Sequence, residues 1–266
     1  MNTTFSIRMI HSDVKEAARL ASQCFQELDR LEDQLSRYRP DSEVSQINAM
    51  SAGESILLTD STYRCLQLAM DAAAATAGLF DPTLGAHTDP PEFSVEEKTT
   101  SQEGQFVLSP NRPEITCHQE GRLIDLGGIG KGFALDELAR ELEGWELSGA
   151  LLSAGASTHR TVGEKPWKMT LKGDEQTKQI ELRRGALSSS GVGFQEGHIV
   201  HPDAQSTETA LRRIWVQTNQ AAYADAFSTA CFLMSSEEME EFVFSLVGEV
   251  LVWIEDPQTG AFRAIS

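Results

Sequence analysis

Apolar residues recur at three- and four-residue steps in the first part of the chain, directly after an alternating N-terminal stretch, residues 1–13. The recurring positions are Ala17, Leu20, Ala21, Cys24, Leu28, Leu31 and Leu35. Ser12 and Asp13 precede them, and their side chains can accept hydrogen bonds from the first backbone N–H groups of a helix. The pattern predicts a strand followed by a long amphipathic helix that ends near Pro40.

A second helical pattern covers residues 59–77. Asp60 or Ser61 is the expected N-cap, and Gly78 is the expected end, because glycine readily adopts the left-handed conformation that terminates helices. Residues 89–122 are less regular, with a Pro90-Pro91 pair, a polar tract and short strand-like pieces such as residues 105–108. We expect a single domain, residues 1–266, with an irregular excursion at about 89–122.

The second half of the chain mixes helical and strand patterns. A strand-like stretch, residues 122–126, leads into a glycine-rich turn and a helical pattern that begins near Phe133. Further strands, a hairpin and two helices are expected at residues 151–153, at 167–171 joined to 179–182, at 221–234 and 236–247, and at 249–255. Consecutive strands beside packed helices favour an α+β fold over a doubly wound sheet.

Composition and charge narrow the classes of partner. The 266 residues include 40% hydrophobic residues, as in ordinary folded domains, and the formal net charge is -18. An acidic surface repels phosphates, which argues against nucleic acid and anionic membranes as partners, and a polyphosphate ligand would need a metal ion or backbone donors. The four cysteines show no CxxC pair, so we expect buried thiols and not disulfides at Cys24, Cys65, Cys117 and Cys231.

No apolar run is long enough for a transmembrane segment, and the N-terminus lacks the apolar core of a secretory signal. A cytoplasmic location is expected if Met1 is the native start. A periplasmic or membrane-anchored protein is expected if a leader was removed.

The glycine cluster, residues 127–132, is the first candidate site. Glycines after a strand allow close backbone approach, and the start of the next helix presents N–H groups to an anion. Lys131 adds a positive charge there. The spacing matches neither the dinucleotide nor the P-loop signature, so a plain strand-to-helix turn stays the alternative to phosphate binding.

Two further clusters carry polar chemistry. Asp225 and Thr229 are four residues apart on one helix face, where a carboxylate and a hydroxyl could bind one hard cation such as Mg²⁺, or could be ordinary helix residues. His198 and His201 lack a third ligand for zinc, but either could act as a general acid or base, or be an ordinary surface histidine. Tyr38, in a polar loop, could stack on a flat ring or simply pack.

Five blocks in this order resemble the ApbE family of FAD:protein FMN transferases. They are EDQLSRYRPDSEVSQIN at 32–48, GLFDPTLG at 78–85, IDLGGIGKGFALD at 124–136, residues 189–202, and ADAFST at 224–229. The resemblance, which runs from Met1 to about Met234, implies a T-fold-like α+β architecture with mixed sheets, packed helices and a flavin cleft between two parts. It also implies Mg²⁺-dependent transfer of FMN from FAD to a Thr or Ser hydroxyl of an acceptor flavoprotein, with release of AMP.

The resemblance also assigns residues. Met1 and Tyr38 would flank the isoalloxazine ring, and a carbonyl near Gly128 would hold Mg²⁺ together with Asp225 and Thr229. The remaining residues of the FAD site would be Asp81, Pro82, Thr83, Lys131, Ser190 and Gly191.

The chain departs from the family pattern at two carboxylates. Gly155-Ala156-Ser157 stands where Gly-Gly-Asp is usual, and His201 stands where the family has the aspartate of His-Ile-Ile-Asp-Pro. His201 could replace that carboxylate as a base, with His198 beside it. The departures leave two alternatives open, a non-catalytic flavin carrier and an FAD pyrophosphatase that yields FMN and AMP.

Overall fold

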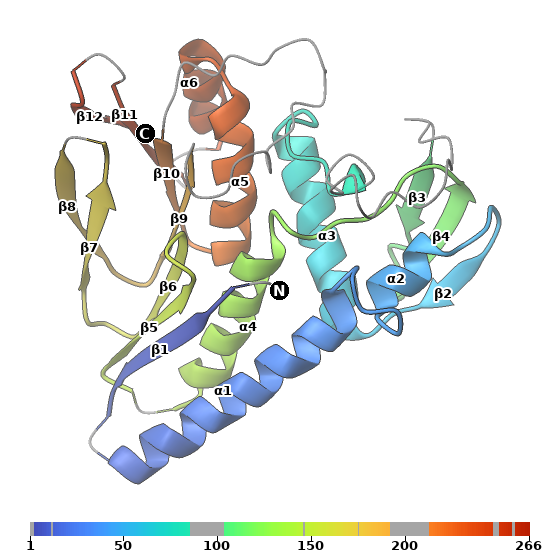
Figure 1. Ribbon diagram of the computed structural model, residues 1–266, viewed down its shortest axis with the longest axis horizontal. Coiled ribbons are helices and arrows are strands. Elements are labelled where there is room, and N and C mark those ends of the chain that lie inside the picture. Colours follow the sequence, from blue (N-terminus) through green and yellow to red (C-terminus); the bar gives the residue numbers. More distant parts are fainter. Residues whose placement is uncertain are drawn as a thin grey trace.

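The fold is α+β, as the sequence predicts, and its helices separate a large sheet from a small one (Figure 1). The computed structural model describes residues 3–11, 13–85, 104–145, 147–174, 176–191, 213–246, 250–256 and 259–266. Within these ranges no helix combines the length and the apolar character that crossing a membrane requires.

The large sheet has seven strands in the order β1-β5-β6-β9-β10-β11-β12, and neighbouring strands pair antiparallel. Their bounds are β1 Phe5–Ile10, β5 Gly149–Ala154, β6 Thr158–Val162, β9 Ala186–Gly191, β10 Arg213–Thr218, β11 Leu251–Glu255 and β12 Phe262–Ile265. Helices α4 (Gly130–Glu143) and α5 (Ala221–Leu233) pack on one face of this sheet. Helix α6 (Ser236–Ser245) follows α5.

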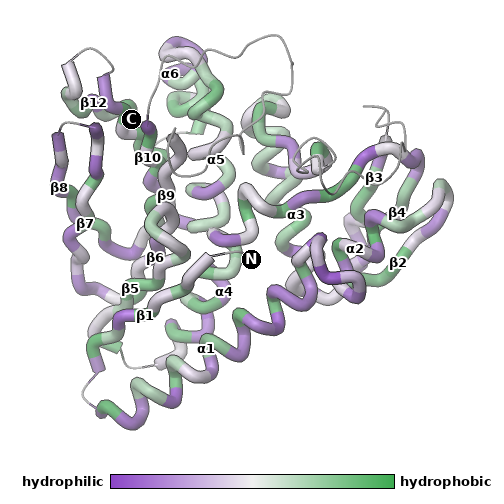
Figure 2. The backbone as a smooth tube through the Cα atoms, viewed as in Figure 1, coloured by the Kyte–Doolittle hydropathy of each residue, from purple (hydrophilic) through white to green (hydrophobic). Residues whose placement is uncertain are grey.

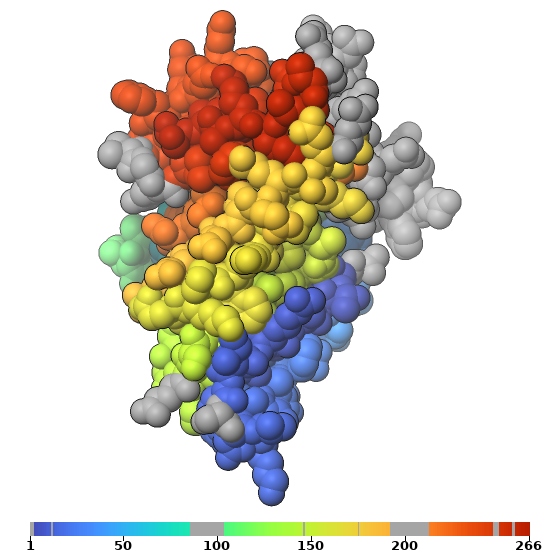
Figure 3. Space-filling model, turned by 90° about the vertical axis from the view of Figure 1, so that its left-hand side faces the viewer, coloured from blue at the N-terminus to red at the C-terminus, as the bar shows by residue number. Residues whose placement is uncertain are grey.

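The opposite face of the large sheet carries a β-hairpin of β7 (Trp167–Lys172) and β8 (Thr177–Leu182). Leu171 and Leu182 of the hairpin share a small apolar cluster with Leu151 and Trp215 of the sheet. Figure 3 shows the hairpin in yellow on this face, between β1 in blue and β12 in red. The hairpin predicted at residues 167–182 is therefore present and has a packing role.

The second part of the molecule is a three-stranded antiparallel sheet with the order β2-β4-β3. Its strands are β2 Ser55–Leu57, β4 Glu114–Gln119 and β3 Gln105–Leu108, and it lies beyond α3 (Asp60–Ala75) and α2 (Glu43–Asn48) in Figure 1. Strands β3 and β4 lie within the predicted excursion at residues 89–122, and residues 86–103 lie outside the described part.

Helix α1 (Val14–Leu35) runs along both parts, and hydrophilic and hydrophobic residues alternate along it in Figure 2. Its buried side chains are Leu20, Cys24, Leu28, Leu31 and Leu35, five of the seven positions of the predicted stripe, and the helix ends at Leu35, before the predicted end near Pro40. The Asp13 side chain caps it by accepting hydrogen bonds from the Lys15 and Glu16 N–H groups.

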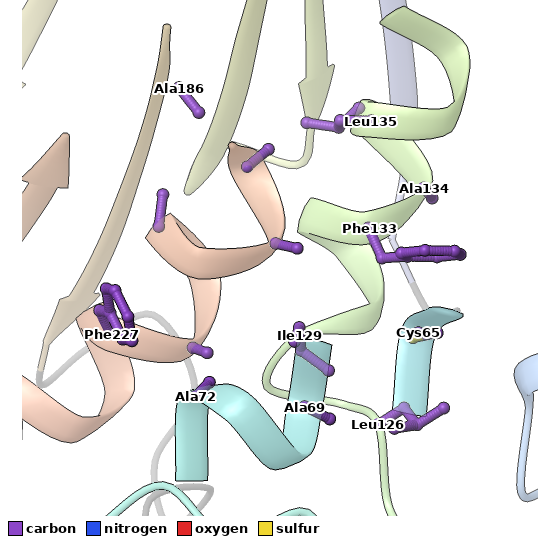
Figure 4. Packing of buried hydrophobic residues seen from close by; sticks show 14 of the residues in the cluster. Cys65, Ala69, Ala72, Leu126, Ile129, Phe133, Ala134, Leu135, Ala186 and Phe227 are labelled. Atoms are coloured by element: carbon purple, nitrogen blue, oxygen red, sulfur yellow. The ribbon is translucent and has the colours of Figure 1, made fainter. Parts of the chain in front are cut away.

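One continuous core joins α1, α3, α4 and α5 to the large sheet. Figure 4 shows members of this core, among them Ala69 and Ala72 of α3, Phe133 of α4 and Phe227 of α5. Helices α4 and α5 approach each other closely at Gly132, where a Cβ would lie 2.0 Å from the Ala221 carbonyl oxygen. Only glycine at this position lets the two helices start side by side.

Two local expectations need correction. Residues 122–126 form no regular strand, because Asp125 donates its N–H to the Pro82 carbonyl and Ile124 exchanges hydrogen bonds with the Asn48 side chain. The N-cap of α3 is Thr59, whose hydroxyl accepts from the Thr62 N–H, and not Asp60 or Ser61. The prediction of four buried free thiols is confirmed.

Candidate functional site

The N-terminus of α4 meets the side of α5 at Asp225, a buried carboxylate. The Gly132 N–H, in the first turn of α4, donates to Asp225 Oδ2 at 3.2 Å. The Lys131 ammonium lies 3.2 Å from Asp225 Oδ1. Helix α4 has no side-chain cap of its own, so a carboxylate from the neighbouring helix satisfies part of its N-terminus.

Buried hydroxyl groups surround the same carboxylate. Thr158 of β6 and Ser188 of β9 donate to Asp225 Oδ1 at 3.2 and 3.4 Å. The Ser228 hydroxyl donates to the Asp225 carbonyl and lies 2.9 Å from the Ser190 hydroxyl. Asp225 is thus held between two strands of the large sheet and the start of α4, which fixes the direction of its side chain.

The glycine turn reaches α5 one helical turn beyond Asp225. A Cβ built on Gly128 would lie 3.7 Å from the Thr229 hydroxyl and 3.0 Å from the Phe80 ring, so glycine permits this close contact. The Lys131 ammonium also donates to the Gly127 carbonyl at 3.2 Å. The structure therefore brings Gly128, Lys131, Asp225 and Thr229 together.

The loop of Asp81, Pro82 and Thr83 is tied to the strand-like segment that precedes the glycine turn. Asp81 accepts from the Thr83 N–H and hydroxyl, and Arg122 donates to both Asp81 and Thr83, at 2.7 and 2.6 Å. The Asp125 N–H donates to the Pro82 carbonyl at 2.8 Å. The Asp81–Thr83 loop is thereby bonded to Asp125, which precedes the first glycine of the turn by two positions.

Tyr38 lies beside these segments because the preceding residue, Arg37, contacts Gly85 and Asp125. Arg37 Nε lies 3.3 Å from Asp125 Oδ2, and Arg37 donates to the Gly85 carbonyl at 2.7 Å. Asp125 in turn accepts from the Gly127 N–H at 2.8 Å. Tyr38 itself is 68% exposed, and Arg37 donates to its hydroxyl, so one face of an aromatic ring is presented to solvent beside these loops.

The donors at Asp225 suit a hard cation. A carboxylate, a hydroxyl and backbone carbonyls are the oxygen ligands that Mg²⁺ accepts, and an ammonium group already binds the carboxylate and one carbonyl. The described residues contain no group of three or more His, Cys, Asp or Glu side chains that could hold a metal. A cation here would therefore rely on Asp225, Thr229, the Gly128 carbonyl and water.

Of the remaining predicted site residues, the structure describes only some. Met1, His198 and His201 lie outside the described residues. Ser190 and Gly191 end β9, where Ser190 faces Ser228 of α5 and Gly191 pairs with Arg213 of β10.

Sequence reasoning missed Thr158, Ser188 and Arg122 as partners of the site. The run Ser188-Ser189-Ser190 in an otherwise apolar strand was the available signal for Ser188. Thr158 directly follows Gly155-Ala156-Ser157, the segment that departs from the family pattern, and the Ser157 hydroxyl lies 3.4 Å from the Thr158 hydroxyl.

A separate cavity of about 700 Å³ lies between α3, α4 and β3. Tyr63, Arg64, Phe106, Phe133 and Arg140 are among the side chains that line it, and no predicted site residue does. The cavity is therefore distinct from the Asp225 cluster.

Comparison with known proteins identifies the family and the fold. A family model, the ApbE family, matches residues 1–252. A FAD:protein FMN transferase of Treponema pallidum is 24% identical over 249 residues, in an alignment that covers 77% of this chain and 68% of that protein. A FAD:protein FMN transferase of Rhodobacter capsulatus is 25% identical over 225 residues, in an alignment that covers 74% of this chain but only 43% of that protein.

The flavin transferase ApbE from Vibrio cholerae has a similar structure, with a TM-score of 0.81 at 20% identity. The alignment covers 99% of this chain and 93% of that one. At this identity the likeness establishes the fold.

Proposed function

The chain belongs to the ApbE family, and we propose that it is a flavin transferase that moves FMN from FAD to a Thr or Ser hydroxyl of an acceptor flavoprotein. In this reaction the acceptor oxygen forms a bond to the phosphorus of the FMN half, the diphosphate bond breaks, and AMP leaves. The observation that carries the proposal is the convergence of the glycine turn, Lys131, Asp225 and Thr229 at one point.

The chemistry of transfer supports these residues. Displacement at phosphorus needs positioning and neutralisation of charge more than covalent help from the enzyme. Asp225, Thr229 and the Gly128 carbonyl would hold Mg²⁺, which would offset the negative charge of the diphosphate. In a chain with a net charge of -18, such a local positive charge is especially needed.

The other residues would bind and orient FAD. Lys131 lies at the start of α4, where a phosphate would also meet the positive end of the helix dipole. Arg122 donates hydrogen bonds to two residues of the Asp81–Thr83 loop, and the exposed ring of Tyr38 is available for stacking on the isoalloxazine. His198 and His201 are the candidate groups to take the proton from the acceptor hydroxyl.

One assay separates transfer from the two alternatives. The purified chain is incubated with FAD, MgCl₂ and an acceptor domain, and intact mass and AMP are measured with and without EDTA. Transfer adds the mass of FMN to the acceptor and releases AMP, and EDTA stops both. AMP without added mass indicates a pyrophosphatase, and bound flavin with neither product indicates a carrier; either result contradicts the proposal.

A further inference from the structure

The Lys131 ammonium is the cation that pairs with Asp225 in this structure. It lies 3.2 Å from a carboxylate oxygen and 3.2 Å from the Gly127 carbonyl oxygen, two of the oxygen types that bind a hard metal ion. The Lys131 side chain is 26% exposed, whereas that of Asp225 is 5% exposed. The ammonium of this ion pair is therefore in contact with solvent, whereas the carboxylate lies in the protein interior.

We propose that Lys131 is the resident cation of this site and that a divalent metal ion binds Asp225 only by displacing it. The proposal rests on the proposed function, because it takes the metal site of that function as given. It adds that Lys131 and the metal ion bind the same carboxylate in alternation, which makes Lys131 a determinant of metal affinity.

Two physical arguments support displacement over joint binding. A metal ion and an ammonium that share one carboxylate oxygen would stand within a few ångströms of each other, and two positive charges at that distance repel strongly in a buried site. Lysine is also suited to leave, because its charge sits on a flexible four-carbon stem and is readily hydrated. Its partial exposure gives the ammonium a path to water.

The carboxylate itself stays in place when the ammonium leaves. The Gly132 N–H and the Thr158 and Ser188 hydroxyls still bind Asp225 from two strands and a helix start. The site is therefore preformed for a second cation, and Lys131 prevents a buried unpaired charge until one arrives.

Asp136 of α4 offers a matched control. It is a second carboxylate, 11% exposed, with a basic partner, since Arg160 Nε lies 3.1 Å from its Oδ1. It also accepts hydrogen bonds from the Ala221 and Ala222 N–H groups at 2.9 Å. We do not propose that this ion pair binds metal.

The test measures Mg²⁺ binding without FAD and without acceptor, by calorimetry and by the thermal midpoint with and without MgCl₂. Lys131→Met should have a lower midpoint than wild type without metal, a larger rise on adding Mg²⁺, and a Kd for Mg²⁺ about tenfold lower, because one competing charge is gone. Lys131→Arg keeps the charge and should bind Mg²⁺ no more tightly than wild type. Arg160→Met should lower the midpoint equally with and without Mg²⁺.

Mg²⁺ binding by the Lys131 variants decides whether the metal ion displaces the ammonium. Equal or weaker Mg²⁺ binding by Lys131→Met overturns the inference and leaves the metal site of the proposed function intact. Absence of Mg²⁺ binding by wild type removes the metal site and the inference together, while flavin transfer is still judged by the mass of the acceptor. If Lys131→Met folds only in Mg²⁺, that dependence supports displacement; if it folds in neither condition, Lys131→Gln carries the same expectations.

Discussion

Helices α4 and α5 each place a carboxylate against the N-terminus of the other helix, and these two contact points have different surroundings. Asp136 of α4 accepts from the Ala221 and Ala222 N–H groups at the start of α5. Asp225 of α5 accepts from the Gly132 N–H near the start of α4. Neither helix has a side-chain cap of its own, so each is capped by its neighbour.

The difference lies in what else surrounds each carboxylate. Asp136 accepts hydrogen bonds from two backbone N–H groups and forms an ion pair with Arg160. At Asp225 the partners include hydroxyls, and the carbonyl of Gly127 and the hydroxyl of Thr229 add oxygen acceptors nearby. Surplus oxygen acceptors suit a cation, so we propose that the Asp225 point binds a cation in addition to capping a helix, whereas the Asp136 point only caps one.

Replacing Asp225 should have the largest effect on activity. Asp225→Ala removes the only carboxylate among the proposed metal ligands, and we expect turnover to fall by about 100-fold or more, the loss typical of a missing electrostatic stabiliser. AMP release measured at saturating MgCl₂ is the readout. Full turnover in this variant would remove the proposed metal role of Asp225.

Replacing Asp136 should lower stability and leave Mg²⁺ binding unchanged. Asp136→Ala leaves Arg160 and two N–H groups at the start of α5 without their partner, and we expect the free energy of unfolding to fall by about 3–5 kcal/mol. Urea unfolding measures this loss. The folded fraction should keep wild-type Mg²⁺ affinity, and a lost Mg²⁺ affinity would break the distinction between the two points.

Gly132 links both points, because it lies between Lys131 and the start of α5. A Cβ at this position would meet the Ala221 carbonyl at 2.0 Å, which forces α4 and α5 apart. We expect Gly132→Ala to lower the free energy of unfolding by about 1–3 kcal/mol or more and to weaken Mg²⁺ binding as well. Gly144→Ala, with open space around its Cβ, is the control and should change neither quantity.

The sequence predicted the regular parts of the fold because their patterns are local. The stripe Leu20 to Leu35 predicted α1, and alternation at residues 167–182 predicted the hairpin. It failed at residues 122–126, where the backbone bonds to Pro82 and Asn48, partners that lie more than 40 positions away and leave no periodic signal.

The candidate site was predictable in part for a similar reason. The four-residue spacing of Asp225 and Thr229 predicted that both lie on one face of α5, and the glycines predicted the turn at the start of α4. Their meeting point depends on the crossing of α4 and α5, and the contacts of Thr158 and Ser188 with Asp225 depend on strand order. Neither the crossing nor the order follows from spacing, so the hydroxyl groups around Asp225 were missed.

Tyr38 tests whether the loops beside the glycine turn bind the flavin. Tyr38→Ala should weaken FAD binding by about 1–3 kcal/mol if the exposed ring stacks on isoalloxazine, by analogy with stacking on nucleic acid bases. Quenching of flavin fluorescence gives the affinity. Phe244→Ala, which removes another exposed ring on α6, is the control, and equal affinities in both variants would contradict stacking at Tyr38.

The smallest expected effect is a pH dependence at Asp136. Burial raises the pKa of Asp136 above its ordinary value of 3.8, against the lowering influence of the Ala221 and Ala222 N–H groups and Arg160. A carboxyl group with a raised pKa in the folded state binds its proton more tightly there than in the unfolded chain. Its contribution to stability is then fully present below the unfolded pKa and is lost as the pH rises through the folded pKa.

Asp136→Asn isolates this contribution, because the amide has nearly the same shape and no proton to release in this range. We expect the free energy of unfolding of wild type minus that of Asp136→Asn to decrease as the pH rises from about 3 to about 6, the range in which carboxyl groups titrate. Urea unfolding of both proteins at each pH gives the difference, in which the titration of all other groups largely cancels. If the difference increases with pH, the two N–H groups and Arg160 lower the pKa of Asp136 by more than burial raises it. This outcome would contradict the expected raised pKa.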